Sequence, residues 1–514
     1  MYITALLWGC ALGSCQGLDQ PGGDPLPVIP ADAVAVSVVP TLEGARTQGV
    51  SRLAAVTGAS GLLDLIHARG GVDLLNKDGL RTAGIEPNGP LTIFKWRDAI
   101  ATAVGVVHAG RFDTLVEERV IRGLGGEMVQ RPGEHLERVA TLPESRSGGA
   151  LAWGTTHNQV GLLVWAPTAD IAAERWWTLS SGTSGYISRD DIKAIRSQVP
   201  SGALMWAVVE GSPTLPPQLG PMGAAVSSML QGLSLWSGAL VAEEHGLSIR
   251  VLGQWMGKGG LPADWLHGQP LSSTITRRLP QSTTAFGRLR LNPARLRLIP
   301  SWLRDRFLPP RVPGPLGEVL PSTGVLLGHL GDEIGVGLLG LDESATLETL
   351  SSGMHDPRRL TQLLHVAVAA RLSSPDAGVS LIQELRTTLQ NKGWTTADVS
   401  AGGWSGLSVR GTHPPQIWNI LTAGDVLLVA SGAGEVERLR ALAEGRALPL
   451  MGDQDAASQN QVAHVRLGFT RLTRELADKG VPPYFLEMLN DLRQLDLWVD
   501  LASDHLALRL ELQL

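Results

Sequence analysis

The chain has 514 residues, more than one hydrophobic core ordinarily supports, so its length predicts several domains or a repeated unit. Hydrophobic residues make up 43% of the chain and charged residues 18%, which excludes an intrinsically disordered protein. The net charge of −6 is small for this length and gives no support to nucleic-acid binding. The 15 tryptophans are scattered along the sequence, which favours packing in cores over a sugar-binding platform.

The first 13 residues, MYITALLWGCALG, form an apolar run without charged side chains. The run is too short to cross a membrane as a helix and has the length of a signal-peptide core, although no Lys or Arg precedes it. The segment that ends Leu12-Gly13-Ser14-Cys15 resembles a bacterial lipoprotein signal. By that resemblance residues 1–15 are the signal peptide and Cys15 carries the lipid, with Cys10 as second choice. Ordinary secretion and a buried N-terminal element are the alternatives.

Residues 16–30, QGLDQPGGDPLPVIP, are rich in Gly and Pro and are predicted to be a flexible tether. In lipoproteins of this kind, a residue such as Gln16 after the lipidated cysteine usually accompanies location in the outer membrane. We therefore expect an exported protein of the bacterial envelope, facing the periplasm or the surface. The rest of the chain has no apolar run near 18 residues, so no transmembrane helix is expected.

The remaining chain predicts five β-α-β-β units, with strands that open near Val34, Ala203, Thr284, His365 and Val462. Alternating apolar segments around polar tips predict hairpins at 150–167, 238–255, 324–341 and 496–513. Further helices are expected in 109–124 and 413–424. The predicted fold class is α+β, with mainly antiparallel sheets and helices on one face.

Joints rich in Pro and Gly set the predicted domain boundaries. A stretch without strand alternation, ESATLETLSSGMHDPRRLTQ, separates the two halves of the chain. The predicted domains are a first, elaborated unit at 31–200, the second and third units at 201–342, a linker at 343–362, and a C-terminal region with the fourth and fifth units at 363–514.

Residues 277–311 form the most basic segment, with nine arginines against one acid, Asp305. Apolar residues alternate with Arg in this segment, a pattern found in elements that bind anionic lipid surfaces. An acidic glycan or an acidic envelope protein would fit equally, and a solvated face whose Arg stems cover the core is the structural alternative. The residues predicted to make an anionic-surface contact are Arg288, Arg290, Arg295, Arg297, Arg304 and Arg306.

The tether followed by Pro30-Ala31-Asp32-Ala33 and by repeated strand-helix-hairpin units is similar to a group of uncharacterised bacterial envelope lipoproteins with an LPADA-like opening. The resemblance implies an envelope location and a lipid anchor. That group has no established activity, so the resemblance assigns no site residues.

Motifs for familiar chemistries are missing or incomplete. The glycine turn in AAVTGASGLLDLI lacks a third glycine, and no tyrosine has a lysine four residues later, which argues against a dinucleotide-dependent dehydrogenase. The chain has neither a G-x-S-x-G nucleophile motif nor an H-E-x-x-H zinc motif. Acid and histidine residues cluster at predicted hairpin tips, where polar side chains face water in any case. We therefore predict no catalytic, metal or cofactor residues.

The sequence favours a non-catalytic envelope lipoprotein that acts as a tethered scaffold or binding module. Its predicted partners are the membrane, through the lipid anchor, and an anionic lipid, a glycan or an envelope protein, with no nucleic acid. A carrier of an apolar or lipid ligand is the first alternative and requires a large apolar cavity. A hydrolase of envelope polymers is the second and requires a polar cleft with two carboxylates or a Ser/His pair.

Overall fold

The computed structural model divides the chain into two compact units. Unit 1 comprises Met1–Ser212, Leu233–Met256 and Gln513–Leu514, and unit 2 comprises Pro213–Gly232 and Gly257–Leu512. The structure describes residues 29–50, 77–129, 138–156, 160–181, 199–211, 233–255, 273–290, 326–349, 363–410, 417–431, 437–441 and 461–514, with single residues and short stretches inside these ranges left out.

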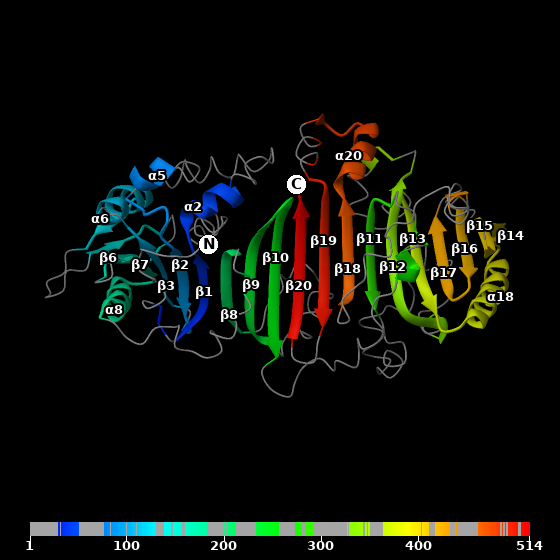
Figure 1. The fold of residues 1–514 in the computed structure, drawn as a ribbon, viewed down its shortest axis with the longest axis horizontal. Coiled ribbons are helices and arrows are strands. Elements are labelled where there is room, and N and C mark those ends of the chain that lie inside the picture. The colour runs from blue at the N-terminus through cyan, green and yellow to red at the C-terminus, as the bar shows by residue number, and fades with distance from the viewer. Residues whose placement is uncertain are drawn as a thin grey trace. The chain divides into compact units, whose positions relative to one another are not determined.

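Unit 1 contains one antiparallel sheet of strands β1 to β10. Hydrogen-bonded neighbours follow the order 4-5-6-7-3-2-1-8-9-10, so β1 lies between β2 and β8, strands from distant parts of the chain (Figure 1). The strands are β1 Ala33–Val39, β2 Leu91–Trp96, β3 Thr102–Val107, β4 Glu127–Met128, β5 Arg138–Thr141, β6 Ala150–Thr155, β7 Val160–Ala166, β8 Ala203–Glu210, β9 Leu233–Glu243 and β10 Gly246–Trp255.

Unit 2 repeats this order ten strands later. Its sheet runs 14-15-16-17-13-12-11-18-19-20, so β11 lies between β12 and β18 just as β1 lies between β2 and β8. In Figure 1 the orange strand β18 accordingly lies beside the green strand β11. The strands are β11 Ala285–Arg290, β12 Leu330–Leu341, β13 Leu364–Leu372, β14 Thr395–Ala401, β15 Trp404–Arg410, β16 Ile417–Ala423, β17 Val426–Ser431, β18 Gln461–Gly468, β19 Gln494–Leu501 and β20 His505–Gln513.

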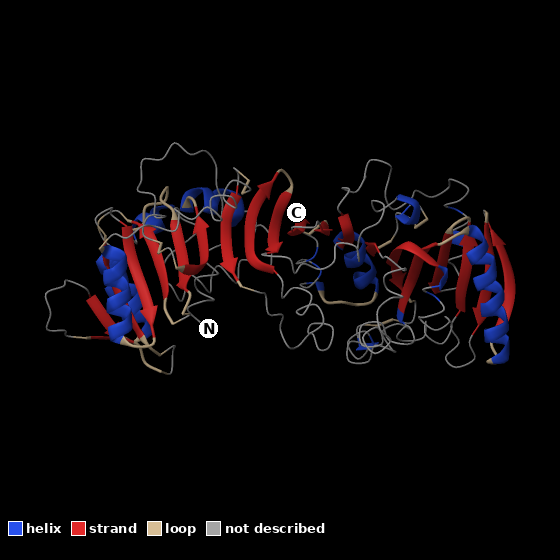
Figure 2. Cartoon of the chain, turned by 90° about the horizontal axis from the view of Figure 1, so that it is seen from below, coloured by secondary structure: helices blue, strands red, loops and turns tan. Residues whose placement is uncertain are grey.

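The described helices are few and mostly short. Of these helices, three have ten residues or more, namely α8 Ala169–Ser180, α18 Pro375–Asn391 and α20 Phe469–Asp478. Figure 2 shows α8 and α18 in blue against the strands of their own units. The remaining ones are α2 Leu42–Ala45, η2 Arg46–Val50, α5 Lys77–Thr82, α6 Phe112–Leu115, η3 Val116–Ile121, α7 Arg122–Leu124 and α11 Ser273–Thr276.

The predicted α+β class with helices on one face of repeated β-α-β-β units is wrong. The chain is predominantly antiparallel sheet, and the described pattern is ten strands that occur twice. The prediction failed because it grouped strands that are close in sequence. The pairings that define the sheets, such as β1 with β8 and β11 with β18, join strands far apart in the chain and leave no trace in local periodicity.

Many individual elements were nevertheless predicted. All five predicted strand openings fall at strands, and the hairpins around 150–167 and 238–255 are β6–β7 and β9–β10. Segment 324–341 contains one long strand, β12, instead of a hairpin. The predicted helix in 413–424 is wrong because residues 417–423 form β16, a continuously buried apolar run that periodicity cannot distinguish from a buried helix.

Capping residues fix where the two longest helices begin. The hydroxyl of Thr168 accepts a hydrogen bond from the backbone N–H of Ile171 at the start of α8. Ser374 does the same for Ala377 at the start of α18, and Pro375 then occupies the first turn, where its missing N–H costs nothing. Helix α18 buries Leu381, Ile382, Leu385 and Leu389, whose spacing of three to four residues forms one apolar stripe.

Both faces of the unit 1 sheet carry apolar cores. Trp176 of α8 packs over Gly154 of β6 on one face, and Phe112 of α6 packs over Gly161 of β7 on the other. A Cβ added at either glycine would lie 2.5 Å or 2.4 Å from the aromatic ring, so only glycine permits these close contacts. The core under α8 includes Val36, Phe94 and Val208, which lie side by side on β1, β2 and β8.

Candidate functional site

The centre of the unit 2 sheet has two faces of opposite character. Side chains of β11 alternate, so that Arg288 and Arg290 lie on one face and Leu289 on the other. Arg288 lies opposite His464 of β18, and His464 lies opposite Trp498 of β19. We call this face the charged face and the reverse side the open face. The charged face carries Phe286, Arg288, Arg290, Glu333, His464, Arg466, Asp496 and Trp498.

His464 and Asp496 form a buried hydrogen-bonded pair at the middle of the charged face. His464 Nε2 lies 2.9 Å from Asp496 Oδ1, and the two residues are 0% and 1% exposed. Burial lowers the pKa of His464, and the hydrogen bond with Asp496 opposes that effect without reversing it. The imidazole is therefore neutral at pH 7, and we assign its proton to Nε2, where Asp496 accepts it.

Two further donors complete the surroundings of Asp496. Arg466 Nε donates to Oδ1 at 2.7 Å, and Gln494 Nε2 donates to Oδ2. Burial alone would raise the pKa of Asp496, but the hydrogen bonds from His464, Arg466 and Gln494 and the charge of Arg466 hold it below its ordinary value. Asp496 is thus an ionised carboxylate whose charge is balanced within the sheet.

Trp498 extends the cluster toward β20. The rings of His464 and Trp498 are stacked, with centroids 5.3 Å apart and an interplanar angle of 2°. The guanidinium of Arg509 lies 5.2 Å from the Trp498 ring centroid, within the range of a cation–π contact. Phe286 meets the His464 ring edge-on at 6.5 Å. The rings of Phe286 on β11 and Trp498 on β19 thus hold the imidazole ring of His464 in one orientation.

Arg288, Arg290 and Glu333 continue the charged face along β11 and β12. They are 4%, 2% and 3% exposed, and Arg290 lies directly opposite Glu333 in the register of the two strands. Burial lowers the pKa of Arg290, and the nearby carboxylates of Asp332 and Glu333 oppose this change. In the part of the chain that the structure describes, Arg290 Nε and Nη2 have no hydrogen-bond partner.

The geometry of the charged face favours a structural role over catalysis. A carboxylate that holds a histidine resembles the base-orienting half of a hydrolytic triad, but such a histidine must reach the reacting group. His464 is completely buried, and its described contacts are Asp496, Trp498 and Phe286, none of which is a serine, threonine or cysteine that the imidazole could activate. Among the described residues, no three His, Cys, Asp or Glu side chains gather as a metal site would require.

The open face is uniformly apolar across four strands. In the row through Gly287, Val336 of β12 and Val465 of β18 flank the glycine, and Leu497 of β19 follows. All twelve residues of the face are partly exposed, and none is charged. The open face comprises Ala285, Gly287, Leu289, Ile334, Val336, Leu338, Ala463, Val465, Leu467, Leu495, Leu497 and Val499.

Three side chains dominate this surface. Leu289, Val336 and Val465 remain 39%, 48% and 46% exposed. At one margin the open face continues into a covered core, because Ile334 and Val368 pack against the apolar cluster beneath α18. The sheet thus presents one apolar face that α18 covers over β14–β17 and that is exposed over β11, β12, β18 and β19.

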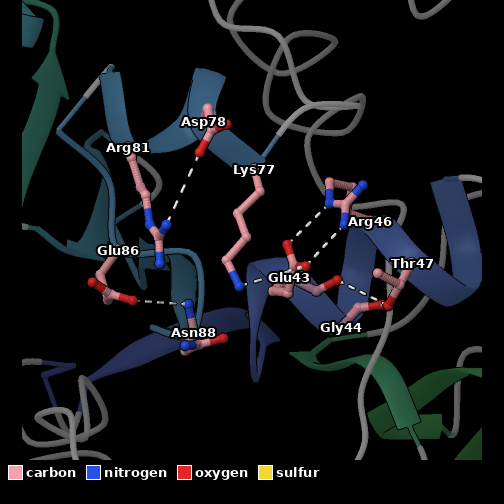
Figure 3. A network of polar contacts seen from close by, with 9 residues as sticks. All are labelled: Glu43, Gly44, Arg46, Thr47, Lys77, Asp78, Arg81, Glu86 and Asn88. Carbon is pink, nitrogen blue, oxygen red and sulfur yellow. Dashed lines mark hydrogen bonds and ion pairs between the residues drawn. The ribbon is translucent and has the colours of Figure 1, made fainter.

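A separate polar network lies in unit 1 around Glu43 of α2 (Figure 3). Arg46 donates to both Glu43 oxygens, from Nε at 2.9 Å and from Nη2 at 2.8 Å, and Lys77 Nζ lies 3.8 Å from the same carboxylate. The Arg46 hydrogen bonds lower the pKa of Glu43. The network joins α2, η2 and α5, and its geometry fits local helix stabilisation.

The structure places only part of the residues predicted for binding. Arg288 and Arg290 are buried on the charged face, among side chains of the same sheet. Arg295, Arg297, Arg304 and Arg306 lie outside the described residues, as do Cys10 and Cys15. Of the histidines predicted at hairpin tips, His245 lies at the β9–β10 turn and is exposed beside Glu244. His329 precedes β12, which is no hairpin, and lies 3.7 Å from Glu384 of α18.

Sequence reasoning missed the open face. The alternation in β11 and β18 correctly separates two sets of side chains, and the usual expectation places the apolar set inward. Here the charged set is buried and the apolar set is exposed. Alternation reveals that a strand has two faces but not which of them is covered, so no signal within Ala285–Arg290 or Gln461–Gly468 identifies Leu289 and Val465 as surface residues.

None of the described helices is long and apolar enough to span a membrane.

No protein-family model and no curated protein matches this chain. Similar solved structures include crystal form III of TP0453, with a TM-score of 0.29 and 9% identity over 47% of this chain and 83% of that chain. Crystal form IV of TP0453 gives a TM-score of 0.28 and 10% identity over 45% and 80%. These scores are too low to assign a fold or a function.

Proposed function

We propose that this protein is a non-catalytic lipoprotein of the bacterial envelope, anchored through Cys15 and acting as a scaffold or binding module. The N-terminal sequence supports the anchor, because an apolar run, the Leu12-Gly13-Ser14-Cys15 segment and a Gly/Pro tether occur in the order of a lipoprotein signal. The open face supports the binding role, and it is the observation on which that role depends.

Proteins that act alone rarely expose a continuous apolar surface of this kind. Single exposed valines are common, but the open face joins twelve apolar positions by direct strand register without a charged residue among them. Covering Leu289, Val336 and Val465 would gain roughly 25 cal/mol for each Å² of apolar surface removed from water. The favoured way to bury the open face is a complementary protein surface.

The charged face supports a non-catalytic role. Asp496 is held by hydrogen bonds from His464 and Arg466 within the sheet, and His464 is 0% exposed. A hydrolase of envelope polymers requires carboxylates or a histidine at the surface of a cleft, where substrate can contact them. The buried partnership of His464 and Asp496 instead supports a role in fixing the register of β18 and β19.

Metabolic labelling with a radioactive fatty acid tests the anchor. The full-length chain and the Cys10→Ala variant should incorporate label in bacterial cells, and the Cys15→Ala variant should not. Label that disappears with Cys10→Ala instead would move the anchor to Cys10. An unlabelled chain that retains Met1 and fractionates with the cell interior would refute the envelope assignment.

Site-specific photocrosslinking in cells tests the binding role. A photoreactive residue at Val465 should give a discrete crosslinked product in the envelope fraction. The matched control is Val379 of α18, which is 58% exposed and apolar but lies outside the open face. No product from Val465, or the same products from both positions, would refute binding through the open face.

A further inference from the structure

The open face extends beyond the twelve positions on β11, β12, β18 and β19. Strand β20 pairs with β19, and Arg509 of β20 stacks on Trp498, which belongs to the charged face. Because side chains alternate along a strand, the intervening leucines of β20 point to the opposite side and extend the open face. These partly exposed leucines are Leu506, Leu508, Leu510 and Leu512.

The composition of this surface distinguishes between possible occupants. Elements that lie on membranes usually carry Trp or Tyr at the interface and Lys or Arg toward the lipid headgroups. The sixteen positions contain only Leu, Val, Ile, Ala and Gly, and Trp498 of β19 belongs to the other face. Such a composition is typical of the interior of a β-sandwich, where two sheets pack face to face about 10 Å apart.

We propose that the open face is a homodimer contact, in which the open faces of two copies of this chain pack as the two sheets of a β-sandwich. This inference rests on the proposed function, since it names the partner of the same binding surface. A two-fold contact places each surface against itself, and a face without charge meets its copy without repulsion. A face with charges of one sign would repel its copy.

The extent of the surface suits a stable dimer. The twelve core positions span four strands spaced by about 4.8 Å and three rungs spaced by about 6.8 Å, and β20 adds a fifth strand. A standard interface takes about 20–30 residues from each partner, with an apolar centre and a polar rim. The sixteen apolar positions would form that centre.

The contact would also continue a core that already exists. Helix α18 covers the same side of the sheet over β14–β17, and Ile334 and Val368 form the margin of the core beneath it. The second copy's sheet would cover β11, β12, β18 and β19 in the same way. Gly287 between Val336 and Val465 leaves a recess, since a Cβ placed there meets only the Val465 Cγ2 atom at 3.7 Å. Leu289 projects beside this recess, so the surface offers both a projection and a site to receive one.

Sedimentation equilibrium of the full-length chain tests this inference. Cys10→Ser and Cys15→Ser are introduced first, so that neither acyl chains nor thiols contribute to association. We expect a dimer of twice the 54.6 kDa chain mass at micromolar concentration. Leu289→Asp or Val465→Asp should weaken dimerisation about 100-fold or more, because each places a charge in a dehydrated apolar contact. Val379→Asp should leave the dimer intact.

Folding and assembly are separated by a milder variant. Val465→Thr keeps the shape and strand preference of valine, and it should weaken dimerisation while circular dichroism stays unchanged. A monomer at all concentrations, or a dimer that survives both aspartate variants, would overturn the inference. If Val465 in cells crosslinks a different envelope protein and the purified chain is monomeric, the dimer is refuted and the proposed function stands. If it crosslinks nothing, both are refuted.

Discussion

The two units arrange ten strands in the same order but build the covered face at the centre of the sheet from opposite chemistry. In unit 1, Val36 lies between Phe94 and Val208, and all three are buried in an apolar core. In unit 2, the corresponding central strand β11 places Arg288 beside His464, with Asp496 one strand further on. The comparison shows that this strand order does not require an apolar core at its centre.

The apolar core of unit 1 and the charged face of unit 2 stabilise their sheets in different ways. Burial of Val36 and its neighbours gains free energy from the hydrophobic effect wherever the side chains fit. The charged face must instead offset the cost of removing Arg288, His464 and Asp496 from water, and it can do so only when each partner is in place. Unit 2 should therefore respond to loss of one charged partner more sharply than unit 1 responds to loss of apolar volume.

Asp496→Ala should have the largest effect. It leaves His464 and Arg466 without their shared acceptor, and breaking a buried pair in this way costs about 3–5 kcal/mol of unfolding free energy. Urea unfolding with pulsed hydrogen exchange on peptides of β18 and β19 measures the loss within unit 2. The control Asp398→Ala breaks the exposed pair with Arg386 and should cost less than about 1 kcal/mol.

Replacing both partners sharpens this result. The double variant His464→Leu with Asp496→Leu makes the charged face resemble the apolar core of unit 1. The double variant removes the buried carboxylate together with the imidazole that it holds, and leaves only the partly exposed Arg466 without its acceptor. It should therefore recover most of the stability lost by Asp496→Ala. A double variant as unstable as Asp496→Ala would show that the charges themselves stabilise unit 2.

Leu162→Ala in unit 1 gives the apolar counterpart. Leu162 is completely buried on β7, and truncation of such a leucine costs about 2–5 kcal/mol according to how far the cavity collapses. Pulsed hydrogen exchange on peptides of β3 and β7 should report this loss. The loss should be the same near pH 7 and near pH 5.5, in contrast to the losses in unit 2.

The stability of unit 2 should fall as the pH is lowered from about 7.5 to about 5.5. The pKa of His464 is lowered in the folded protein, so the unfolded chain binds a proton at a higher pH than the folded chain does. The resulting slope is at most about 1.4 kcal/mol per pH unit below the ordinary pKa of about 6.5. Asp496, whose folded pKa is also lowered, extends the loss below its ordinary pKa of about 3.9.

The variant His464→Gln checks the source of this slope. Glutamine can still donate a hydrogen bond to Asp496 but does not titrate, so urea midpoints of β18 and β19 should become less dependent on pH. His245→Gln is the matched control, because His245 is 77% exposed and lies outside the cluster. A slope unchanged in His464→Gln would mean that another group titrates.

Glu43→Gln should have the smallest effect. It removes the charge that Arg46 and Lys77 contact in unit 1, in a network of partly buried side chains (Figure 3). The expected cost is about 0.5–1 kcal/mol, and it should shrink in high salt, which screens exposed pairs. Thermal unfolding in low and high salt measures it. If Glu43→Gln lowers the free energy of unfolding by the same amount in high salt, the network contributes more to stability than exposed ion pairs do.

The sequence predicted strands well and their partners poorly. Alternation located β1, β8, β11, β13 and β18, because an apolar-polar period of two is a local property of the chain. It could not show that β11 pairs with β18, since this pairing depends on residues more than a hundred positions apart. The β-α-β-β grouping failed for that reason, and it concealed the twofold repeat of ten strands.

The two faces of unit 2 were beyond prediction for a different reason. Arg288 and Arg290 read as surface residues because arginine is rarely buried, and they are 4% and 2% exposed. Their burial depends on carboxylates and aromatic rings supplied by β12, β18 and β19. Leu289 is 39% exposed, although leucine is more often buried. Only the assembled sheet determines which set of side chains is covered.

The position of the central strands has a consequence for how the chain reaches its native state. Strand β1 gains its second neighbour only when Val209 of β8 pairs with Ala35. Strand β11 likewise gains its second neighbour only when His464 of β18 pairs with Arg288. Pairings so distant in sequence close slowly, because a long loop loses its freedom before any contact forms. Each half of the protein should thus remain incomplete until nearly all of it has been synthesised. A nascent chain with bare apolar strands for that long would need a chaperone to prevent aggregation.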